Sequence, residues 1–247
     1  MSGARASEAT KRLIVLGATG SIGRQTVEVV EHLNKERKRA GKPDAFRIVG
    51  IAGGKNEREA LEIARRLGVA RVAMHCGEGA EEAGGVRVER GPHASERLVR
   101  EVECDLVLAA IVGSAGLPAT LAAVEMGLDV ALANKETLVA AGAIVVPAAR
   151  ASGARLLPVD SEHSAIWQCL SGREGEACPP CDVSSEVKRV TLTASGGPFR
   201  TASREQTYHA TAKEALKHPT WTMGAKVTVD SASLTNKGLE LIEAHWL

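Results

Sequence analysis

Two acidic residues follow the apolar run 156–159 and are separated by a single residue. Asp160 and Glu162 carry carboxylates, the hard oxygen ligands that Mg²⁺ and Mn²⁺ prefer, and their spacing lets both reach one ion. The same residues also suit a helix start, with Asp160 or Ser161 as N-cap and Glu162 in the first turn, where the helix dipole favours negative charge. Local sequence leaves both interpretations open.

A third carboxylate stands near the end of the chain, beside a cation. Asn236 and Glu240 lie one helical turn apart, and Lys237 shares their face. A lysine three residues before a glutamate is the poorer order for an intrahelical ion pair. A metal-binding carboxylate beside a phosphate-binding cation explains the pattern better. Two hydroxyls, Ser195 before a diglycine and Ser231, would suit a phosphate cradle.

A glycine-rich turn separates the apolar run 12–16 from a helical pattern that begins at Ser21. Gly17, Gly20 and Gly23 form a G-x-x-G-x-x-G sequence at this junction. Bare glycines let backbone amides approach a pyrophosphate at the positive end of a helix. Taken alone, the pattern also fits an ordinary tight turn between a strand and a helix.

The end of the second apolar run, 46–51, bears on the choice of nucleotide. A site for NAD usually places Asp or Glu there to bind the ribose 2′-hydroxyl, whereas this run leads into Gly54, Lys55 and Asn56. A cation and an amide suit a 2′-phosphate, which a carboxylate would repel. We therefore expect NADPH rather than NADH. The alternative for Lys55 is an exposed loop lysine.

A short polar loop, 218–224, contains one of only three tryptophans in the chain. Pro219 and Gly224 break regular structure around Trp221, which favours a lid that closes over a substrate and excludes water. The alternative is a tryptophan folded onto a neighbouring apolar patch, with His218 as a hydrogen-bonding loop residue.

Alternating elements must position these side chains. Strand patterns at 12–16, 46–51, 70–74, 105–111, 130–133 and 155–159 alternate with helical patterns at 21–33, 56–67, 117–126 and 137–151. This alternation predicts α/β architecture, with a doubly wound parallel sheet in an N-terminal Rossmann-like NADP-binding domain. A polar insertion at 171–186 precedes a further strand pattern, 187–193, and the last helix is expected at 239–247. We place the boundary near residue 155, giving domains 1–154 and 155–247.

The composition describes an ordinary globular protein. Apolar residues make up 44%, charged residues 25%, and the net charge is +1, which argues against a nucleic-acid partner. No apolar run is long enough to predict a membrane span, and residues 1–11 lack a signal-peptide pattern. Five scattered cysteines favour a reducing compartment, hence the cytoplasm. The closest pair, Cys178 and Cys181, encloses two prolines and is more typical of a loop than of a zinc or redox site.

Six motifs occur together and in order: Gly17-Ala-Thr-Gly-Ser-Ile-Gly23, Ala133-Asn-Lys-Glu136, Pro158-Val-Asp-Ser-Glu-His163, Ser195-Gly-Gly-Pro-Phe199, His218-Pro-Thr-Trp-Thr-Met-Gly224 and Asn236-Lys-Gly-Leu-Glu240. Together they resemble the motifs of the 1-deoxy-D-xylulose 5-phosphate reductoisomerases, over residues 13–247. The resemblance implies an NADPH-dependent conversion of 1-deoxy-D-xylulose 5-phosphate to 2-C-methyl-D-erythritol 4-phosphate in the non-mevalonate isoprenoid pathway.

The resemblance also implies roles for individual residues. The ligands of Mn²⁺, Mg²⁺ or Co²⁺ would be Asp160, Glu162 and Glu240. Substrate contacts would come from Ser161, Ser195, His218, Trp221, Ser231, Asn236 and Lys237, with Lys135 near the reacting carbons. The catalytic set would be Lys135, His218 and the three ligands. The cofactor would contact Gly17, Thr19, Gly20, Ser21, Ile22, Gly23, Gly54, Lys55, Asn56, Asn134, Glu136, Met223 and Gly224.

Members of this family continue well beyond the position matched by Leu247. We therefore expect the second, α+β catalytic domain to be incomplete, with a homodimer implied by the resemblance. Two competing hypotheses are a non-catalytic NADPH-binding fragment and an NADP-dependent dehydrogenase that performs no isomerisation. Turnover that depends on a divalent metal would separate the proposed activity from both.

Overall fold

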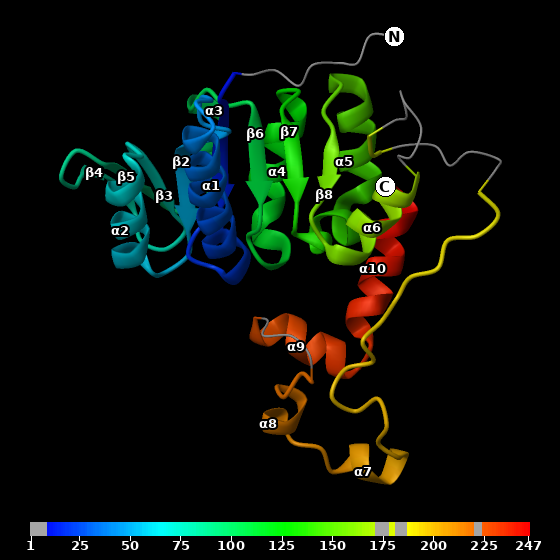
Figure 1. Ribbon diagram of the computed structural model, residues 1–247. Helices are drawn as coiled ribbons and strands as arrows, with labels where there is room; N and C mark the ends of the chain where they lie inside the picture. Colours follow the sequence, from blue (N-terminus) through cyan, green and yellow to red (C-terminus); the bar gives the residue numbers. More distant parts are fainter. Residues whose placement is uncertain (1–8, 171–177, 181–186, 220–223) are drawn as a thin grey trace.

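The computed structural model describes residues 9–170, 178–180, 187–219 and 224–247. Its central feature is an eight-stranded sheet with the order β4-β5-β3-β2-β1-β6-β7-β8 (Figure 1). Neighbouring strands are parallel except for the antiparallel pair β4 and β5. The strands are β1 Lys11–Leu16, β2 Phe46–Gly53, β3 Arg71–Met74, β4 Gly79–Glu82, β5 Arg87–Arg90, β6 Leu106–Ala109, β7 Asp129–Leu132 and β8 Leu156–Pro158.

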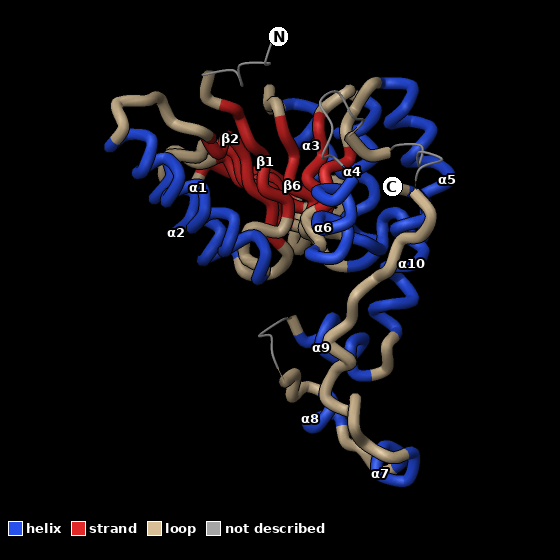
Figure 2. Tube along the Cα trace, turned by 45° about the vertical axis from the view of Figure 1, so that its right-hand side comes forward, coloured by secondary structure: helices blue, strands red, loops and turns tan. Residues whose placement is uncertain are grey.

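Helices cover both faces of the sheet (Figure 2). Val27 of α1 and Ile63 of α2 pack on one face, while Leu98 of α3, Ala123 of α4 and Leu138 of α5 pack on the other. Two apolar layers therefore enclose strands that are buried on both sides, which explains their continuous apolar runs. The helices are α1 Ser21–Arg39, α2 Glu57–Leu67, α3 Ala94–Glu101, α4 Leu117–Glu125, α5 Lys135–Ser152 and α6 Ser161–Leu170, with a 3₁₀ turn, η1, at Gly113–Gly116.

The sheet is doubly wound, which confirms the predicted fold class of the first part of the chain. From β1 the chain moves outward through β2 and β3, then returns to β6 on the other side of β1. Where the strand order reverses, the loops after β1 and β6 lie side by side at the carboxyl ends of the strands, the usual place for a dinucleotide. β8 also belongs to this sheet, although it begins beyond the boundary that we place near residue 155.

The sequence patterns missed one strand, β4, and predicted another that the structure does not contain among its described residues. β4 contains only Gly, Ala and Glu and is exposed along its length, so it has no apolar alternation to detect. The predicted strand at 187–193 is wrong, because these residues form no strand in the structure. An apolar run becomes a strand only where a neighbouring strand takes up its backbone hydrogen bonds, and β8 of the described sheet pairs only with β7.

The chain beyond α6 leaves the sheet and then returns to it. Residues 187–203 run away from the sheet to the short helices α7, Arg204–Tyr208, and α8, Ala212–Ala215 (Figure 1). Helix α9, Ala225–Ala232, precedes α10, Thr235–Trp246, which packs against α5. The last helix thus begins four residues before the predicted 239. Within the described chain, no helix has both the length and the apolarity to cross a membrane.

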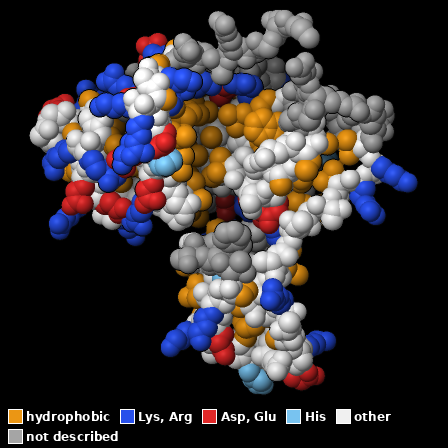
Figure 3. Space-filling view, viewed as in Figure 1, with side chains coloured by type: hydrophobic (Ala, Val, Ile, Leu, Met, Phe, Trp, Pro, Cys, Tyr) orange, Lys and Arg blue, Asp and Glu red, His pale blue; other side chains and the backbone are white. Residues whose placement is uncertain are grey.

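Part of the apolar surface remains uncovered. Figure 3 shows hydrophobic side chains gathered on the viewed face over β6, β7 and β8. Near α6 and the end of α10, a groove of about 370 Å³ is lined mostly by apolar residues, among them Trp167, Leu170, Val190 and Leu241. Leu241 is 66% exposed. The second part of the chain therefore has a much less closed core than the sheet.

One close contact fixes α10 against the first part of the chain. The indole of Trp246 lies over Gly142 of α5, next to a kink at Ala141, where φ is −142°. A Cβ atom at position 142 would collide with the indole ring. Glycine is required here because a bare backbone lets the ring approach, and this contact anchors the helix that carries Glu240.

We expect Gly142→Ala to destabilise the protein by about 1–3 kcal/mol, because the added methyl group overpacks this contact. Alanine ordinarily stabilises a helix interior by about 1 kcal/mol relative to glycine. The stability change expected here is therefore opposite in sign to the one that helix propensity predicts. Gly238→Ala is a matched control, because Gly238 lies within α10 and a Cβ added there would meet no atom of the described residues within 4 Å. Thermal unfolding would measure both changes, and equal effects would contradict the steric explanation.

Candidate functional site

Three carboxylates from two distant parts of the chain meet beside the carboxyl end of β8. Asp160 precedes α6, Glu162 lies in its first turn, and Glu240 comes from α10. Each offers an oxygen within 4.8 Å of the others. Glu240 is 1% exposed, so α10 carries an acidic side chain into a place with little water. The structure thus brings together all three residues that the sequence suggested as metal ligands.

Two lysines neutralise this carboxylate cluster. Lys135, at the start of α5, forms an ion pair with Asp160, and its Nζ lies 3.1 Å from Glu240 Oε1. Lys237 pairs with Glu162, and its Nζ lies 2.7 Å from Glu240 Oε2. Three negative charges therefore face two positive charges. The cluster keeps a formal negative excess, which favours binding of a further cation.

Asn236 extends the same network. Its Oδ1 accepts a hydrogen bond of 2.9 Å from Lys135 Nζ. It lies one turn before Glu240 on α10, as the sequence spacing predicted, and its amide donates to that carboxylate at 2.5 Å. Lys135 is thus bound by groups on α10 as well as by Asp160.

The pKa directions follow from burial and from these partners. Burial raises the pKa of Asp160, and the nearby Glu240 carboxylate adds to this effect. Burial would also raise the pKa of Glu162, but hydrogen bonds from Lys237 and Ser161 outweigh it and lower that pKa to about 2. The pKa of Lys135 is raised despite burial, because Asp160 and Glu240 favour its charged form. Lys135 is therefore a fixed positive charge at neutral pH rather than a base.

The carboxylate cluster fits a divalent metal by its donor set. Mg²⁺ and Mn²⁺ take carboxylate oxygens, at about 2.1 Å for Mg²⁺, so oxygens that share one ion lie up to about 4.2 Å apart. The oxygens of the cluster all lie within 4.8 Å of one another, so small side-chain movements would let them share one ion. Asp160 and Glu162 point toward lysines rather than only toward the amides at the start of α6, so helix capping alone does not explain them.

A second cluster brings two of the predicted phosphate ligands together. Ser195 Oγ lies 3.0 Å from His218 Nε2 and accepts a hydrogen bond from the amide of Gly197. Gly197 has φ +67°, and a Cβ there would lie 2.5 Å from the carbonyl oxygen of Ser231. The diglycine turn therefore packs directly on the end of α9. Ser195, His218 and Ser231, far apart in sequence, are neighbours in space.

The glycine turn occupies the predicted place between β1 and α1. Gly17 has φ +89°, and a Cβ there would lie 2.5 Å from the carbonyl oxygen of Ala110. A Cβ at Gly23 would collide with the carbonyl oxygen of Gly17, so both positions require glycine. Gly20 is the N-cap, Ser21 opens the helix, and no acidic residue lies in its first turn. The positive end of α1 is thus left for an anion.

The loop after β2 leaves a cation exposed. Lys55 is exposed, and Asn56 caps α2 by accepting a hydrogen bond from the amide of Glu59. Glu59 forms an ion pair with Arg24, which lowers the pKa of its carboxyl group, and Arg90 does the same for Glu57. The carboxylates near this loop are therefore each paired with an arginine.

Two other predicted cofactor residues have protein partners. Asn134 is buried, accepts from Thr137 at the start of α5 and donates to the carbonyl oxygens of Ile111 and Gly113. Glu136 forms an ion pair with Lys226 of α9. These contacts join the nucleotide end of the sheet to the second part of the chain.

The remaining predicted site residues have simple outcomes. Trp221 and Met223 lie outside the described residues, and so does Cys181. Gly224 is exposed and is the N-cap of α9. Thr19 and Ile22 are half-buried in the glycine turn and the first turn of α1, and Gly54 is exposed beside Lys55. Cys178 is half-buried.

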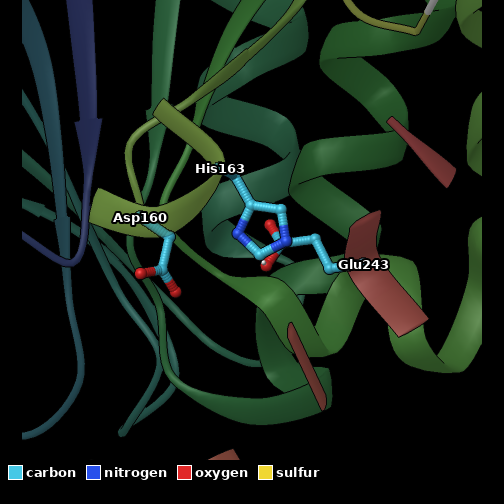
Figure 4. A group of neighbouring side chains, drawn as sticks. All are labelled: Asp160, His163 and Glu243. Atoms are coloured by element: carbon cyan, nitrogen blue, oxygen red, sulfur yellow. Dashed lines mark ion pairs between the residues drawn. The ribbon is translucent and has the colours of Figure 1, made fainter. Parts of the chain in front are cut away.

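The predictions missed two buried residues behind the carboxylate cluster. His163 of α6 and Glu243 of α10 are 3% and 0% exposed, and His163 Nδ1 lies 3.4 Å from Glu243 Oε2 (Figure 4). Burial and the nearby Asp160 raise the pKa of Glu243 to about 8. Sequence contained a signal for both, because His163 adjoins Glu162 and Glu243 lies three residues after Glu240, on the same helical face.

We expect Glu243 to make the metal-free protein less stable as pH rises. Its pKa is raised in the folded state, so between about 4.5 and 8 the unfolded chain loses this proton while the folded chain keeps it, and stability falls across that window. Glu243→Gln should remove this pH dependence. The stability of the variant relative to the unmodified protein should therefore increase from about pH 5 to about pH 8. Thermal unfolding in EDTA would measure it, with the exposed Glu62→Gln as control. Parallel curves would contradict the expectation.

Comparison with known proteins shows which family the sequence of this chain matches. A family model described as 1-deoxy-D-xylulose 5-phosphate reductoisomerase matches residues 13–142, and a model of the C-terminal domain of the same family matches residues 156–247. A reductoisomerase of that description from Pelotomaculum thermopropionicum is 47% identical over 244 residues, and one from Mycobacterium avium is 47% identical over 237 residues.

Solved structures agree with the sequence matches. A 1-deoxy-D-xylulose 5-phosphate reductoisomerase from Zymomonas mobilis in complex with NADPH has a TM-score of 0.76 at 36% identity. A DOX-P reductoisomerase in complex with NADPH, fosmidomycin and magnesium has a TM-score of 0.79 at 33% identity. Both matches cover 96% of this chain and 58% of the other. The chain likewise spans 58% of the Pelotomaculum protein and 53% of the Mycobacterium protein.

Proposed function

Because the chain belongs to the 1-deoxy-D-xylulose 5-phosphate reductoisomerase family, we propose that it catalyses the family's NADPH- and metal-dependent reaction. The substrate would be 1-deoxy-D-xylulose 5-phosphate and the product 2-C-methyl-D-erythritol 4-phosphate. The observation that carries the proposal is the meeting of Asp160, Glu162 and Glu240 within 4.8 Å, beside the buried Lys135. Hydride transfer by itself does not require such a cluster, whereas a rearrangement that develops charge on adjacent substrate oxygens does gain from a metal bound there.

Asp160, Glu162 and Glu240 would hold the divalent metal. A bound metal ion would supply positive charge that polarises neighbouring substrate oxygens while the carbon skeleton rearranges. Lys135 would add a second, permanent positive charge on the same side, since its raised pKa keeps its proton in place. Its ammonium group donates hydrogen bonds toward α10 and Asp160, and is thus oriented before any substrate arrives.

The phosphate of the substrate would be bound by hydroxyl, amide and ammonium groups. Ser195 and His218 already form one hydrogen-bonded unit, and Ser231 lies against the diglycine turn beside it. Lys237 would supply the positive charge and Asn236 an amide. Ser161 and Trp221 complete the proposed substrate contacts. Because Lys237 and Asn236 also contact Glu240, the phosphate ligands and the carboxylate cluster would hold one substrate in a fixed orientation.

NADPH would lie along the carboxyl edge of the sheet. Its pyrophosphate would bind at Gly17–Gly23 and the start of α1, and its 2′-phosphate at Gly54, Lys55 and Asn56. Asn134, Glu136, Met223 and Gly224 would contact the nicotinamide half. The exposed ammonium of Lys55 and the pairing of Glu57 and Glu59 with arginines support NADPH over NADH, because little free negative charge remains there.

We further infer a homodimer in the cytoplasm, acting on this small phosphorylated sugar. The uncovered apolar side chains over β6, β7 and β8 support further association of this face. The free thiols of Cys76, Cys104 and Cys169 support a reducing compartment.

The central test follows NADPH oxidation by absorbance with 1-deoxy-D-xylulose 5-phosphate, with and without Mg²⁺ or Mn²⁺. We expect turnover only with metal. Glu240→Gln should lower it by at least about a hundredfold, because removing a ligand weakens both metal binding and charge stabilisation, while NADPH affinity stays within about threefold. NADPH binding without turnover would favour a non-catalytic nucleotide-binding protein. Metal-independent oxidation of simple alcohols would favour an ordinary dehydrogenase.

Lys55→Ala should distinguish the two nicotinamide cofactors. Loss of this exposed ammonium group should weaken NADPH binding by about tenfold and leave NADH binding unchanged, since only NADPH carries the 2′-phosphate. Fluorescence titration would give both dissociation constants. Lys42→Ala, another exposed loop lysine, is the matched control. An equal loss for NADPH and NADH would remove Lys55 from the 2′-phosphate site.

A further inference from the structure

The pair formed by His163 and Glu243 joins the two segments that supply the carboxylate cluster. His163 follows Glu162 directly on α6, and Glu243 lies one turn after Glu240 on α10. The imidazole Nε2 of His163 donates a hydrogen bond of 2.9 Å to the backbone carbonyl of Glu240, and its Nδ1 faces Glu243 at 3.4 Å. One side chain of α6 thus contacts α10 at two successive turns.

Burying the polar groups of this pair costs free energy that packing alone does not repay. His163 Nδ1 and both carboxyl oxygens of Glu243 are buried without a hydrogen bond of standard geometry among the described residues. Such groups usually cost about 1–3 kcal/mol each, whereas apolar side chains of the same size would pack there without penalty. Packing of α6 on α10 alone therefore does not account for an imidazole and a carboxyl group in this place.

The position of the pair indicates what it does. Asp160 has an oxygen within 4.8 Å of His163 and Glu243 and belongs equally to the carboxylate cluster (Figure 4). Ligands supplied by two separate helices hold a fixed spacing only if those helices cannot slide along each other. A hydrogen bond from α6 to the backbone of Glu240 itself prevents that sliding at the ligand.

We propose that His163 and Glu243 are positioning residues that set the spacing between Asp160 and Glu162 on one side and Glu240 on the other. This role rests on the proposed metal-dependent function. Glu243 orients the imidazole through Nδ1, and the imidazole holds the Glu240 backbone through Nε2. The pair touches neither substrate nor cofactor, and it acts by keeping the three carboxylates at a distance that suits one small divalent cation.

The test compares two substitutions of similar size at position 243 in the full chain. Glu243→Leu removes the polar group that faces Nδ1, while Glu243→Gln keeps a polar group in that place. We expect Glu243→Leu to raise the Mn²⁺ dissociation constant at least about tenfold, within the usual range for groups that orient metal ligands. Glu243→Gln should stay within about threefold of the unmodified chain. Electron paramagnetic resonance of free Mn²⁺ gives both values without relying on turnover.

Thermal unfolding separates positioning from simple stability. Leucine removes buried polar atoms, so the unfolding temperature of Glu243→Leu should not fall, while its metal affinity does. His163→Leu should weaken Mn²⁺ binding to the same extent, and the double variant should lose no more than either single one, because both break one connection. His209→Leu, which changes an exposed histidine, is the matched control.

Three results would overturn the proposal. One is unchanged Mn²⁺ affinity in Glu243→Leu, another is an additive loss in the double variant, and the third is equal weakening by leucine and glutamine, which would indicate charge alone. Failure of the proposed function has a different signature, because the unmodified chain would then bind no Mn²⁺ at all. NADPH titration of each variant verifies that the nucleotide-binding part remains folded.

Discussion

Like charges held close together are the constraint on which the second half of this structure depends. Asp160, Glu162 and Glu240 would repel one another in a poorly solvated place, and only nearby cations make their proximity tolerable. Lys135 and Lys237 supply those cations from α5 and α10. Each of these lysines bonds two of the carboxylates, so the network joins the end of the Rossmann-like sheet to the last helix of the chain.

The start of α5 connects the Rossmann-like sheet with the carboxylate cluster. β7 leads directly into α5. Its N-cap, Asn134, fixes the loop after β6, and its first residue, Lys135, reaches the carboxylates. Glu136 then pairs with Lys226 on α9. Three consecutive residues, 134–136, therefore contact the loop after β6, the carboxylate cluster and α9.

Local patterns predicted most of the sheet and several of the residues that meet at its edge. Continuous apolar runs identified β1, β2 and β6, and the glycines at 17 and 23 stand where a side chain would collide with backbone. The run at 187–193 misled because a strand depends on a neighbour that periodicity does not reveal. His163 and Glu243 were missed for a related reason: their importance lies in facing each other across two helices, and neither residue type is unusual in its own stretch of sequence.

The contact of Trp246 with Gly142 also makes substitutions at these two distant positions depend on each other. Any larger residue at 142 would collide with the indole, so such a change is tolerated only together with a smaller side chain at 246. Because α10 carries Glu240 and Lys237 as well, a compensating pair of substitutions would also move the acid and the ammonium group. Substitutions in the interface between α5 and α10 are thus limited by the need to keep Glu240 and Lys237 in place. Residues 142 and 246 should therefore vary together.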